Sequence, residues 1–530
     1  MPRRLKIALV NLASDKDNWG IMMVPLGLQY LAAALRKRLG DRVDVTMGDM
    51  GLIPKQTDVR PIVQAYLADL KPDIVGLRGF STQADAYPLV AKAAKHERPD
   101  CLVVAGGPHA ATRSPSLFDE TAIDLVVPLE GEITFTEIVQ AVLEGRDPRE
   151  VPGVEWHDDS GRGAAPPRAL IDDLDSIEFP DYRGIDIDAY QGYLTMTGLR
   201  PKGKATSLFT TRGCYFRCTY CHDHFGKAVR KRSLDDVFAE MEGLMNERGV
   251  TEFQIIDDIF NADRPRAIAF FDRVVKLGWD LNFSFPNGLR GDLITEEFVA
   301  AAKAAGAYHW SLAIESASPR IQKLVQKHNK LDRLMNAITL SDRYGVFTST
   351  FTMLGFPTET REEMQMTVDF LLSSKAHMAL MFHVQPFEGT EIREQVQQLT
   401  SGRMDGEFGY SSVVSDSATW FTEIPPQEIR EIIVDTSWRF HFDPQRMRRM
   451  KDLTATCHAA SALAEYLHFC LGECGYDLST MPAGEARTIL DSLVQHQGSV
   501  PYEQWVPPVR LHELAALNEE HRNANPLASG

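Results

Sequence analysis

The sequence predicts an α/β protein with three parts: a doubly wound Rossmann-like parallel sheet, a (β/α)6 partial TIM barrel and a mostly helical C-terminal part. Short β-branched runs alternate with amphipathic helical patterns over residues 1–145, and the alternation resumes with a regular period over residues 205–390. Beyond residue 390 the pattern is helical, and residues 146–204 have the Pro, Gly and Asp content of a linker. We therefore expect domains at 1–145, 205–390 and 391–530, joined by a linker at 146–204.

Composition limits the class of protein. The 530 residues are 44% hydrophobic, which is enough for several cores, and the net charge of -17 opposes broad binding to a phosphate backbone, so we expect no nucleic acid partner. Seven cysteines, three of them clustered, indicate a reducing compartment, so we expect a cytoplasmic protein. We also expect no signal peptide, and no membrane span because no apolar run reaches 18 residues.

The first part should place its ligand beyond the carboxyl ends of its strands. Strands are expected at 6–12, 43–48, 74–80, 102–105 and 125–128, and helices at 27–38, 59–70, 84–97 and 132–144. The loops after three strands carry Ser81-Thr82-Gln83, Gly106-Gly107-Pro108-His109 and Glu130-Gly131-Glu132. Paired glycines let backbone amides approach a bulky ligand, and the absence of a GxGxxG sequence after the first strand disfavours a dinucleotide.

The second part should gather polar groups at one mouth, because the strands of a β/α barrel all end on the same side. Strands are expected at 207–211, 252–256, 282–285, 309–314, 349–354 and 380–385. The residues that follow them include Asp257, Asp258, Asn287, Arg290, Glu315 and Gly355.

Three cysteines follow the first barrel strand. Cys214, Cys218 and Cys221 are spaced three and then two residues apart, so a tight loop can fold them around three corners of an iron–sulfur cube. The fourth iron would lack a protein ligand and could chelate a substrate or cosubstrate. A zinc site is the alternative, since His222 and His224 lie close by in the sequence.

The Cys214-x3-Cys218-x2-Cys221 spacing, with Tyr220 before the last cysteine, resembles the signature of the radical S-adenosylmethionine (SAM) enzymes. The resemblance implies a 4Fe-4S cluster on the three cysteines, SAM on the open iron, and reductive cleavage of SAM to methionine and a 5'-deoxyadenosyl radical. It also implies a reducing partner such as flavodoxin or ferredoxin. By the same comparison the SAM-binding residues are Tyr220, Asn287, Arg290, Glu315 and Gly355.

The first part resembles the cobalamin-binding domain fused ahead of many radical SAM enzymes. The cobalamin-binding residues would be Arg78, Ser81, Thr82, Gly106, Gly107, Glu130 and Gly131. The Asp-x-His-x-x-Gly element that supplies a histidine to cobalt elsewhere is absent, and Gly48-Asp49-Met50-Gly51 stands in its place. Arg78 could therefore lie beneath the corrin and keep that face of cobalt unligated; alternatively, it pairs with an acidic residue at the sheet end.

Together these resemblances imply a cobalamin-dependent radical SAM methyltransferase, which moves a methyl group from SAM through methylcobalamin to an unactivated carbon of a small-molecule substrate. An oxidative cyclase or ring-rearranging enzyme without methyl transfer is one alternative. A non-catalytic cobalamin sensor is another, disfavoured because a sensor needs no open-iron cysteine triad. The substrate is not readable from the sequence.

Several further features have two interpretations each. Lys227, Arg230, Lys231 and Arg232 could receive an electron donor or form a solvated basic face, and His109 is expected to form a hydrogen bond within its loop. Helices at 425–440, 444–451, 459–472 and 484–495 are expected to cap the barrel mouth. Cys457, Cys470 and Cys474 are expected to be structural thiols and not a second cluster.

Overall fold

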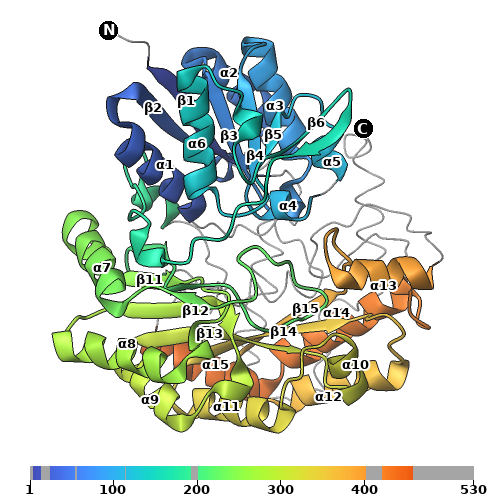
Figure 1. Cartoon of the computed structure of the whole chain (residues 1–530). Coiled ribbons are helices and arrows are strands. Elements are labelled where there is room, and N and C mark those ends of the chain that lie inside the picture. Colours follow the sequence, from blue (N-terminus) through green and yellow to red (C-terminus); the bar gives the residue numbers. More distant parts are fainter. Residues whose placement is uncertain are drawn as a thin grey trace.

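The computed structural model describes residues 4–13, 24–53, 57–113, 115–191, 201–400 and 421–457. Figure 1 shows two lobes, with the N-terminal sheet and its helices above and the barrel below. The α/β class, the doubly wound sheet and the partial barrel are confirmed. No helix among the described residues is both long enough and apolar enough to cross a membrane.

The first sheet has seven strands in the order β2-β1-β3-β4-β5-β6-β7. They are β1 (Leu5–Asn11), β2 (Val43–Asp49), β3 (Ile74–Arg78), β4 (Leu102–Gly106), β5 (Leu125–Val126), β6 (Glu155–Asp158) and β7 (Gly161–Ala164). The first five are parallel, and β1 lies between β2 and β3. The chain therefore reverses its winding direction between β1 and β3, which is where ligands of such sheets bind.

The sheet extends further along the chain than expected. Strands β6 and β7 form an antiparallel hairpin on the edge of the sheet, within the segment that the sequence predicts as linker. Asp158 closes its turn by accepting a hydrogen bond from the Ser160 amide at 2.9 Å. A short, largely exposed hairpin has no apolar alternation, so composition alone assigns it to a loop.

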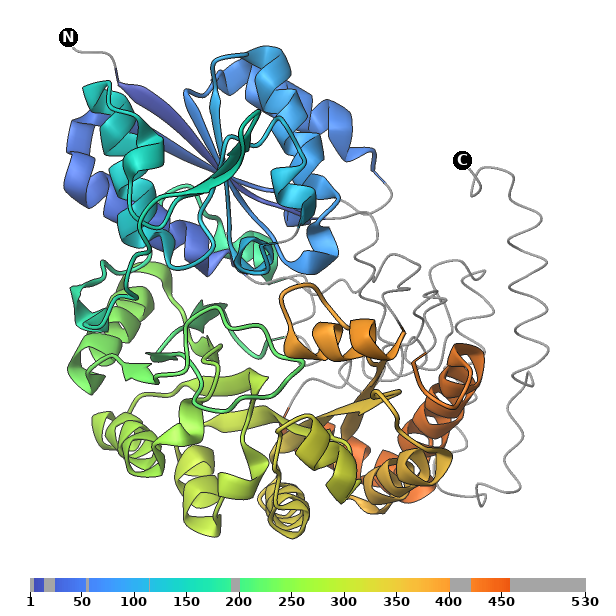
Figure 2. The same cartoon turned by 45° about the vertical axis from the view of Figure 1, so that its right-hand side comes forward.

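Helices cover both faces of the first sheet (Figure 2). Helices α1 (Leu26–Leu39) and α6 (Gly131–Glu144) pack on one face, and α2 (Val59–Leu70) and α3 (Ala86–Glu97) pack on the other. Two short helices, α4 (Pro108–Ala111) and α5 (Pro115–Phe118), follow β4.

The barrel has six parallel strands in the sequential order β8-β11-β12-β13-β14-β15. They are β8 (Ala205–Leu208), β11 (Glu252–Ile255), β12 (Asn282–Leu289), β13 (Ala307–Glu315), β14 (Phe347–Leu354) and β15 (Met378–His383). The helices between them are α7 (Leu234–Arg248), α8 (Arg264–Leu277), α9 (Glu296–Ala304), α10 (Pro319–Leu324), α11 (Leu331–Arg343) and α12 (Arg361–Ser373). A small antiparallel hairpin, β9 (Thr211–Arg212) and β10 (Arg230–Lys231), encloses the cysteine loop.

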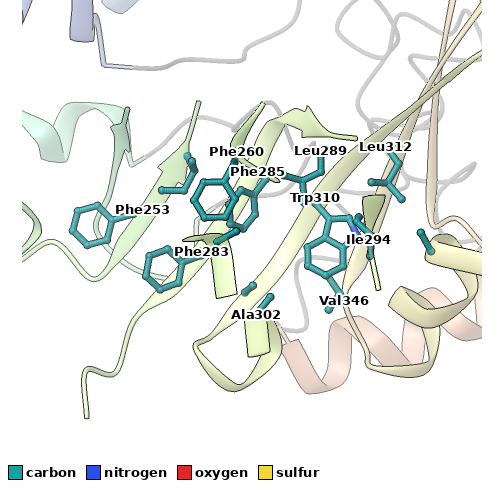
Figure 3. Close-up of a cluster of buried hydrophobic side chains, with 14 of the residues drawn as sticks. Phe253, Phe260, Phe283, Phe285, Leu289, Ile294, Ala302, Trp310, Leu312 and Val346 are labelled. Carbon is teal, nitrogen blue, oxygen red and sulfur yellow. The ribbon is translucent and has the colours of Figure 1, made fainter. Parts of the chain in front are cut away.

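Aromatic side chains fill the layer between the barrel strands and their helices. Phe253, Phe283, Phe285 and Trp310 are at most 1% exposed and lie in one continuous cluster (Figure 3). The buried Trp310 indole donates to the Ser341 hydroxyl at 3.0 Å, so its one polar atom is satisfied. A close-packed wall of this kind fixes the strands, and with them the loops at their carboxyl ends.

Of the helices described after the barrel, the first contacts the cysteine loop, where the Ile392 amide donates to the Thr219 carbonyl at 2.9 Å, and the others lie elsewhere than expected. These helices are α13 (Glu391–Leu399), α14 (Pro426–His441) and α15 (Pro444–Cys457). Ile429, Ile433 and Phe440 of α14 join the barrel core, and His441 accepts the Ala379 amide of β15 at 3.1 Å. Helix α14 thus covers the outer face of β15, where its apolar stripe is buried, and does not cap the mouth. The helices expected at 459–472 and 484–495, with Cys470 and Cys474, lie outside the described residues.

Candidate active site

The carboxyl edges of the two sheets face each other. On the first sheet, the loop after β4 continues into α4 and Thr112; on the barrel, the loop after β15 contains Gly389. A Cβ atom on Gly389 would lie 2.9 Å from the Thr112 Cα, so the two backbones are in direct contact. The cysteine loop belongs to the same barrel edge and therefore lies at the junction of the two lobes (Figure 1).

A glycine closes the cysteine loop. Gly213 has φ +93°, and a Cβ atom there would lie 2.2 Å from the Ala228 carbonyl oxygen. Its amide donates to Asp258 at 2.9 Å, and the next amide, of Cys214, donates to the Gly226 carbonyl at 3.2 Å. Burial raises the pKa of Asp258 to about 6. No other residue type fits at 213 without moving the opposite strand of the loop.

The three cysteine thiols are neighbours and free of disulfides. The Cys218 and Cys221 side chains hydrogen-bond to each other, and Cys214 is close enough to Cys218 to interact with it electrostatically. Three free thiols on one short loop match the donor set of a cluster ligated at three corners. In the described part of the chain, no group of three His, Cys, Asp or Glu side chains converges on a single ion position. His222 instead contacts the Glu388 carbonyl at 3.0 Å.

Tyr220, Glu315 and Lys327 form a hydrogen-bonded group beside the thiols. The Tyr220 hydroxyl donates to Glu315 Oε1 at 3.1 Å, and the Lys327 ammonium donates to the same oxygen at 3.3 Å. Glu315 ends β13 with φ +62°, a left-handed conformation that is strained for a glutamate and re-aims its side chain. Burial opposes the Lys327 charge, but Glu315, Cys218 and Cys221 outweigh it and raise the pKa of Lys327.

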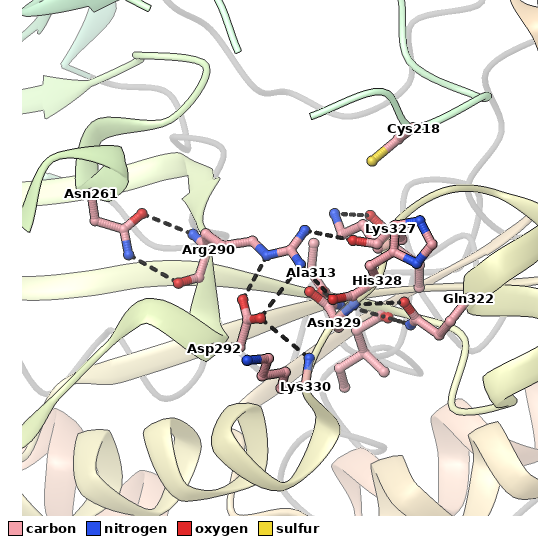
Figure 4. A network of polar contacts seen from close by, with 12 residues as sticks. Cys218, Asn261, Arg290, Asp292, Ala313, Gln322, Lys327, His328, Asn329 and Lys330 are labelled. Atoms are coloured by element: carbon pink, nitrogen blue, oxygen red, sulfur yellow. Dashed lines mark hydrogen bonds and ion pairs between the residues drawn. The ribbon is translucent and has the colours of Figure 1, made fainter. Parts of the chain in front are cut away.

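Arg290 is at the centre of a hydrogen-bond network below the cysteine loop (Figure 4). Its Nε donates to Asp292 at 2.6 Å, and its terminal nitrogens donate to the carbonyls of Lys327 and His328 at 2.8 and 2.9 Å and more weakly to Asp292. The guanidinium also lies 4.0 Å from the centre of the Phe216 ring. Four of its five N–H groups are therefore committed, so Arg290 positions the loop that carries Lys327 and His328.

Asn287 and Gly355 border the same mouth. Asn287 is exposed, and its amide donates to the Asp257 carbonyl at 3.0 Å. Gly355 has φ +89°, and its amide donates to Glu359 at 2.7 Å, beside the Phe356 amide at 3.0 Å. Burial raises the pKa of Glu359 to about 7. The Phe356 ring lies 6.1 Å from the Tyr220 ring, so the Gly355 loop adjoins the cysteine loop.

On the opposing sheet, Arg78 and Asn11 end the adjacent strands β3 and β1, at the point where the winding reverses. Within the described chain, Arg78 donates to the Asn11 amide oxygen at 2.9 Å and forms no ion pair with a carboxylate. Asn11 donates in turn to Asp49 at 2.8 Å, and the Tyr190 hydroxyl donates to Asp49 at 2.6 Å. Burial lowers the pKa of Arg78, and nearby Asp49 opposes this effect. Arg78 remains a cation held at the binding edge.

The glycine loop after β4 packs closely against Arg78. Gly107 has φ +82°, and a Cβ atom there would lie 2.8 Å from Arg78 Cγ, so only glycine leaves room for this arginine. His109 Nδ1 lies 3.3 Å from the Ser81 hydroxyl, so its hydrogen bond is with the loop after β3 and not within its own loop. Its Nε2 is buried with no partner among the described residues, and burial lowers the pKa of His109 to about 4. Gly106 and Thr82 lie at the same edge, Gly106 bonded through its carbonyl to the Tyr87 hydroxyl at 2.7 Å.

Glu130 and Gly131, which the sequence predicts as cobalamin-binding, make contacts within the protein. Both Glu130 oxygens are occupied by Arg212, Arg230 and the Ile171 amide. A Cβ atom on Gly131 would lie 3.1 Å from Leu31, so this glycine lets α6 pack closely on α1. The predicted basic face is also smaller, because Arg230 and Arg232 are buried in ion pairs with Glu130 and Glu240.

Sequence reasoning missed several residues of this site. Lys327 lies in the loop between α10 and α11, where no strand-end pattern marks it. Asn11 could have been predicted as a site residue, because it ends a strand at the binding edge. Tyr87, Arg212 and Glu132 act through contacts between distant segments, which no local pattern reveals.

We expect Gly213→Ala to abolish stable cluster assembly, because its Cβ would collide with the Ala228 carbonyl across the loop. Iron and sulfide content after anaerobic reconstitution measures this. Gly243→Ala in α7 is the matched control: no atom lies within 4 Å of its added Cβ, and alanine favours a helix. Full iron content in Gly213→Ala would show that the loop relaxes around the added methyl group.

Two family models match the chain. The model described as "Radical SAM superfamily" matches residues 208–371, which span the cysteine loop and most of the barrel. The model described as "B12 binding domain" matches residues 18–139, which begin after β1 and contain β2 to β5 with the helices between them. Each match thus falls on one of the two lobes whose binding edges face each other.

Relatives match both parts together. The chain is 32% identical over 380 residues to an uncharacterised methyltransferase of Pyrococcus horikoshii, covering 70% of this chain and 78% of that protein. It is 29% identical over 424 residues to the cytidylyl-2-hydroxyethylphosphonate methyltransferase of Streptomyces wedmorensis, covering 71% and 78%.

Among solved structures, the radical SAM methyltransferase TsrM from Kitasatospora setae, with cobalamin and a [4Fe-4S] cluster bound, has the same fold. The two chains superpose with a TM-score of 0.61 over 76% of each, at 21% identity. From the matches to both family models and to the Pyrococcus relative, the chain belongs to the cobalamin-dependent radical SAM enzymes.

Proposed function

We propose that this enzyme is a C-methyltransferase, which moves a methyl group from SAM through cobalamin to an unactivated carbon of a small molecule. The observation that carries the proposal is that the cysteine loop and the cobalamin-type sheet meet edge to edge, with Gly389 against Thr112. Two reactive groups bound at these edges would address one substrate carbon at short range. An sp³ carbon without an acidic proton has no nucleophile for polar methyl transfer, which is why this chemistry needs a radical.

When bound, the cluster with SAM supplies a carbon radical, and cobalamin supplies the methyl group. In the proposal, Cys214, Cys218 and Cys221 hold the cluster. Tyr220 and Glu315 face SAM from the barrel side, because their hydrogen bond lies beside the thiols. Asn287 and the Gly355 loop complete the rim of the SAM site, and Asp257 and Asp258 hold the backbone before the cysteine loop in place.

Lys327 is the cation of the proposed SAM site. It is the ammonium group nearest Glu315, and its electrostatic partners include Cys218 and Cys221. Arg290 and Asn329 fix the turn that carries it, through carbonyl hydrogen bonds from Arg290 and a 2.8 Å bond from the Asn329 amide to Ala313. A fixed ammonium beside the cysteine thiols would suit the carboxylate of SAM.

Arg78 acts on the opposite side of the junction. In the proposal, Arg78 would lie beside a bound cobalamin; its guanidinium cannot ligate cobalt and would keep water from that side. Asn11 anchors it from the neighbouring strand, and the ring of Phe80 lies 4.4 Å from the guanidinium. Gly106, Gly107, Ser81 and Thr82 would help to hold the cobalamin, and His109 Nε2, which has no partner among the described residues, could bond to one of its amides.

The proposed chemistry consumes single electrons and needs an intact cluster. A flavodoxin or ferredoxin donor and a cytoplasmic location are therefore part of the proposal. The remainder of the predicted basic face is Lys227, which is partly buried, and Lys231, which is exposed; each lies beside an acidic residue, Asp223 and Asp263.

We expect Cys214→Ala, Cys218→Ala and Cys221→Ala each to abolish cluster assembly and deoxyadenosine formation while cobalamin stays bound, because the two cofactors belong to separate domains. Iron content, deoxyadenosine and bound cobalamin are measured on the same samples. Cys101→Ala, a buried cysteine of the first sheet, is the control. A variant of the triad with the iron content of the wild type would contradict the assignment.

We expect Arg78→Lys to retain cobalamin but to accumulate a water-ligated cob(II)alamin, because a lysine does not fill the place of the guanidinium. Reduction to the cob(I) state, and with it methylation, should slow. Electron paramagnetic resonance of cob(II)alamin measures the axial ligand, and Arg98→Lys at the other end of the sheet is the control. A spectrum and rate unchanged from wild type would reduce Arg78 to a structural residue.

Methyl transfer itself is tested with SAM labelled on its methyl group, reconstituted protein and fractionated cell extracts. We expect the label in a product carbon, with deoxyadenosine formed alongside. Deoxyadenosine with an altered but unlabelled product would instead indicate a cyclase or ring-rearranging enzyme. Bound cobalamin with no SAM cleavage under any condition would favour a sensor.

A further inference from the structure

Two buried arginines bracket the cysteine loop. Arg212 and Arg230 are directly opposite each other in the β9–β10 hairpin, and the loop with all three cysteines runs between them. Their side chains are 5% and 7% exposed. The hairpin is only two residues long on each strand, so backbone pairing alone holds the base of this loop weakly.

Both arginines reach the same carboxylate across the junction. Glu130 follows β5 of the cobalamin-type sheet and directly precedes α6. Its Oε1 accepts from Arg212 at 2.8 Å and from Arg230 at 2.9 Å, and its Oε2 accepts from Arg230 at 2.8 Å and from the Ile171 amide at 2.8 Å. Its side chain is 3% exposed, so one glutamate ties both ends of the cysteine loop and the interdomain segment to the first sheet.

A second carboxylate balances the charge. Arg212 also donates to Glu132 at 2.6 Å, so two cations face two anions in this buried cluster. Tyr30 of α1 and Phe225 of the cysteine loop each lie 5.2 Å from the Arg212 guanidinium. Contacts from both lobes therefore fix this guanidinium from several sides.

The cost of burying these charges indicates that the ion cluster fixes geometry more than it adds stability. Burying charges costs several kcal/mol per ion, and apolar residues of similar volume often stabilise a protein as well or better. An ion cluster differs from an apolar contact because its hydrogen bonds have preferred lengths and directions. Here those directions converge on Glu130 from each end of the loop that carries the cysteines.

We propose that Glu130, with Arg212 and Arg230, is a positioning clamp that sets the separation and orientation of the cysteine loop relative to the cobalamin-type sheet. Glu130 acts through the arginines and touches neither cofactor. The proposal uses the two cofactors of the family and is independent of whether a methyl group is moved.

The test is Glu130→Gln in the full chain, with both cofactors reconstituted. Glutamine keeps the shape and one acceptor oxygen but loses the charge and the second acceptor. We expect iron and cobalamin to load as in wild type. In wild type, the reduced cluster should speed up the electron spin relaxation of cob(II)alamin. We expect Glu130→Gln to lose this enhancement, because it falls steeply with the distance between the two cofactors. Arg212→Lys should show a smaller loss, since one ammonium cannot bridge Glu130 and Glu132 as a guanidinium does.

A second readout needs no cofactor. The Ile171 amide donates directly to Glu130, so hydrogen exchange of this amide in the apoprotein reports the clamp. We expect exchange to be about tenfold faster in Glu130→Gln, the factor that corresponds to one charge-assisted hydrogen bond. This measurement also applies if the variant loads its cofactors poorly.

Asp73→Asn is the matched control. Asp73 is a buried carboxylate of the same sheet, paired with Arg98 and the Lys6 amide at the amino end of the strands, away from the junction. It should leave both the spin relaxation and the Ile171 exchange unchanged. Wild-type relaxation in fully loaded Glu130→Gln would overturn the proposal. So would loss of cobalamin with unchanged Ile171 exchange, which would make Glu130 a cobalamin ligand.

Discussion

Parallel strands all end on one edge, and this protein sets two such edges against each other. The backbones of Gly389 and Thr112 touch across the junction, and they are too close for a side chain at position 389. The cysteine loop lies on one edge and Arg78 on the other, and both are held by rigid strands with aromatic packing behind them. The remaining features of the site depend on how the two edges face each other, because the cysteine loop belongs to one lobe and Arg78 to the other.

Apart from Arg78, the polar residues described above at the junction are either neutral or paired. Burial lowers the pKa of His109 and His224 to about 4, so both are uncharged near neutral pH. The buried charges on Arg212 and Arg230 are balanced by those on Glu130 and Glu132. Pairing these charges lowers the cost of burying them between the two lobes.

Much of the fold followed from local patterns. The six barrel strands and the five parallel strands of the first sheet were predicted because hydrophobic periodicity is a property of short segments. The cysteine triad was predictable for the same reason. The contact between Glu130 and Arg212 could not be predicted, because a glutamate after a strand has the same local pattern whether it faces a ligand or an arginine 82 residues away. The position of α14 was missed because a helical pattern does not state which surface its apolar stripe covers.

The placement of Glu130 limits how freely these domains can be exchanged between relatives. The carboxylate belongs to the first sheet, its two arginines belong to the barrel, and Ile171 lies on the chain between them. A chimaera joined between residues 145 and 205 would separate the glutamate from its partners and leave buried charges unpaired unless the donor supplied the same set. In evolution, Glu130, Arg212 and Arg230 are then expected to vary together. The two lobes and the ion cluster between them should be inherited as one unit.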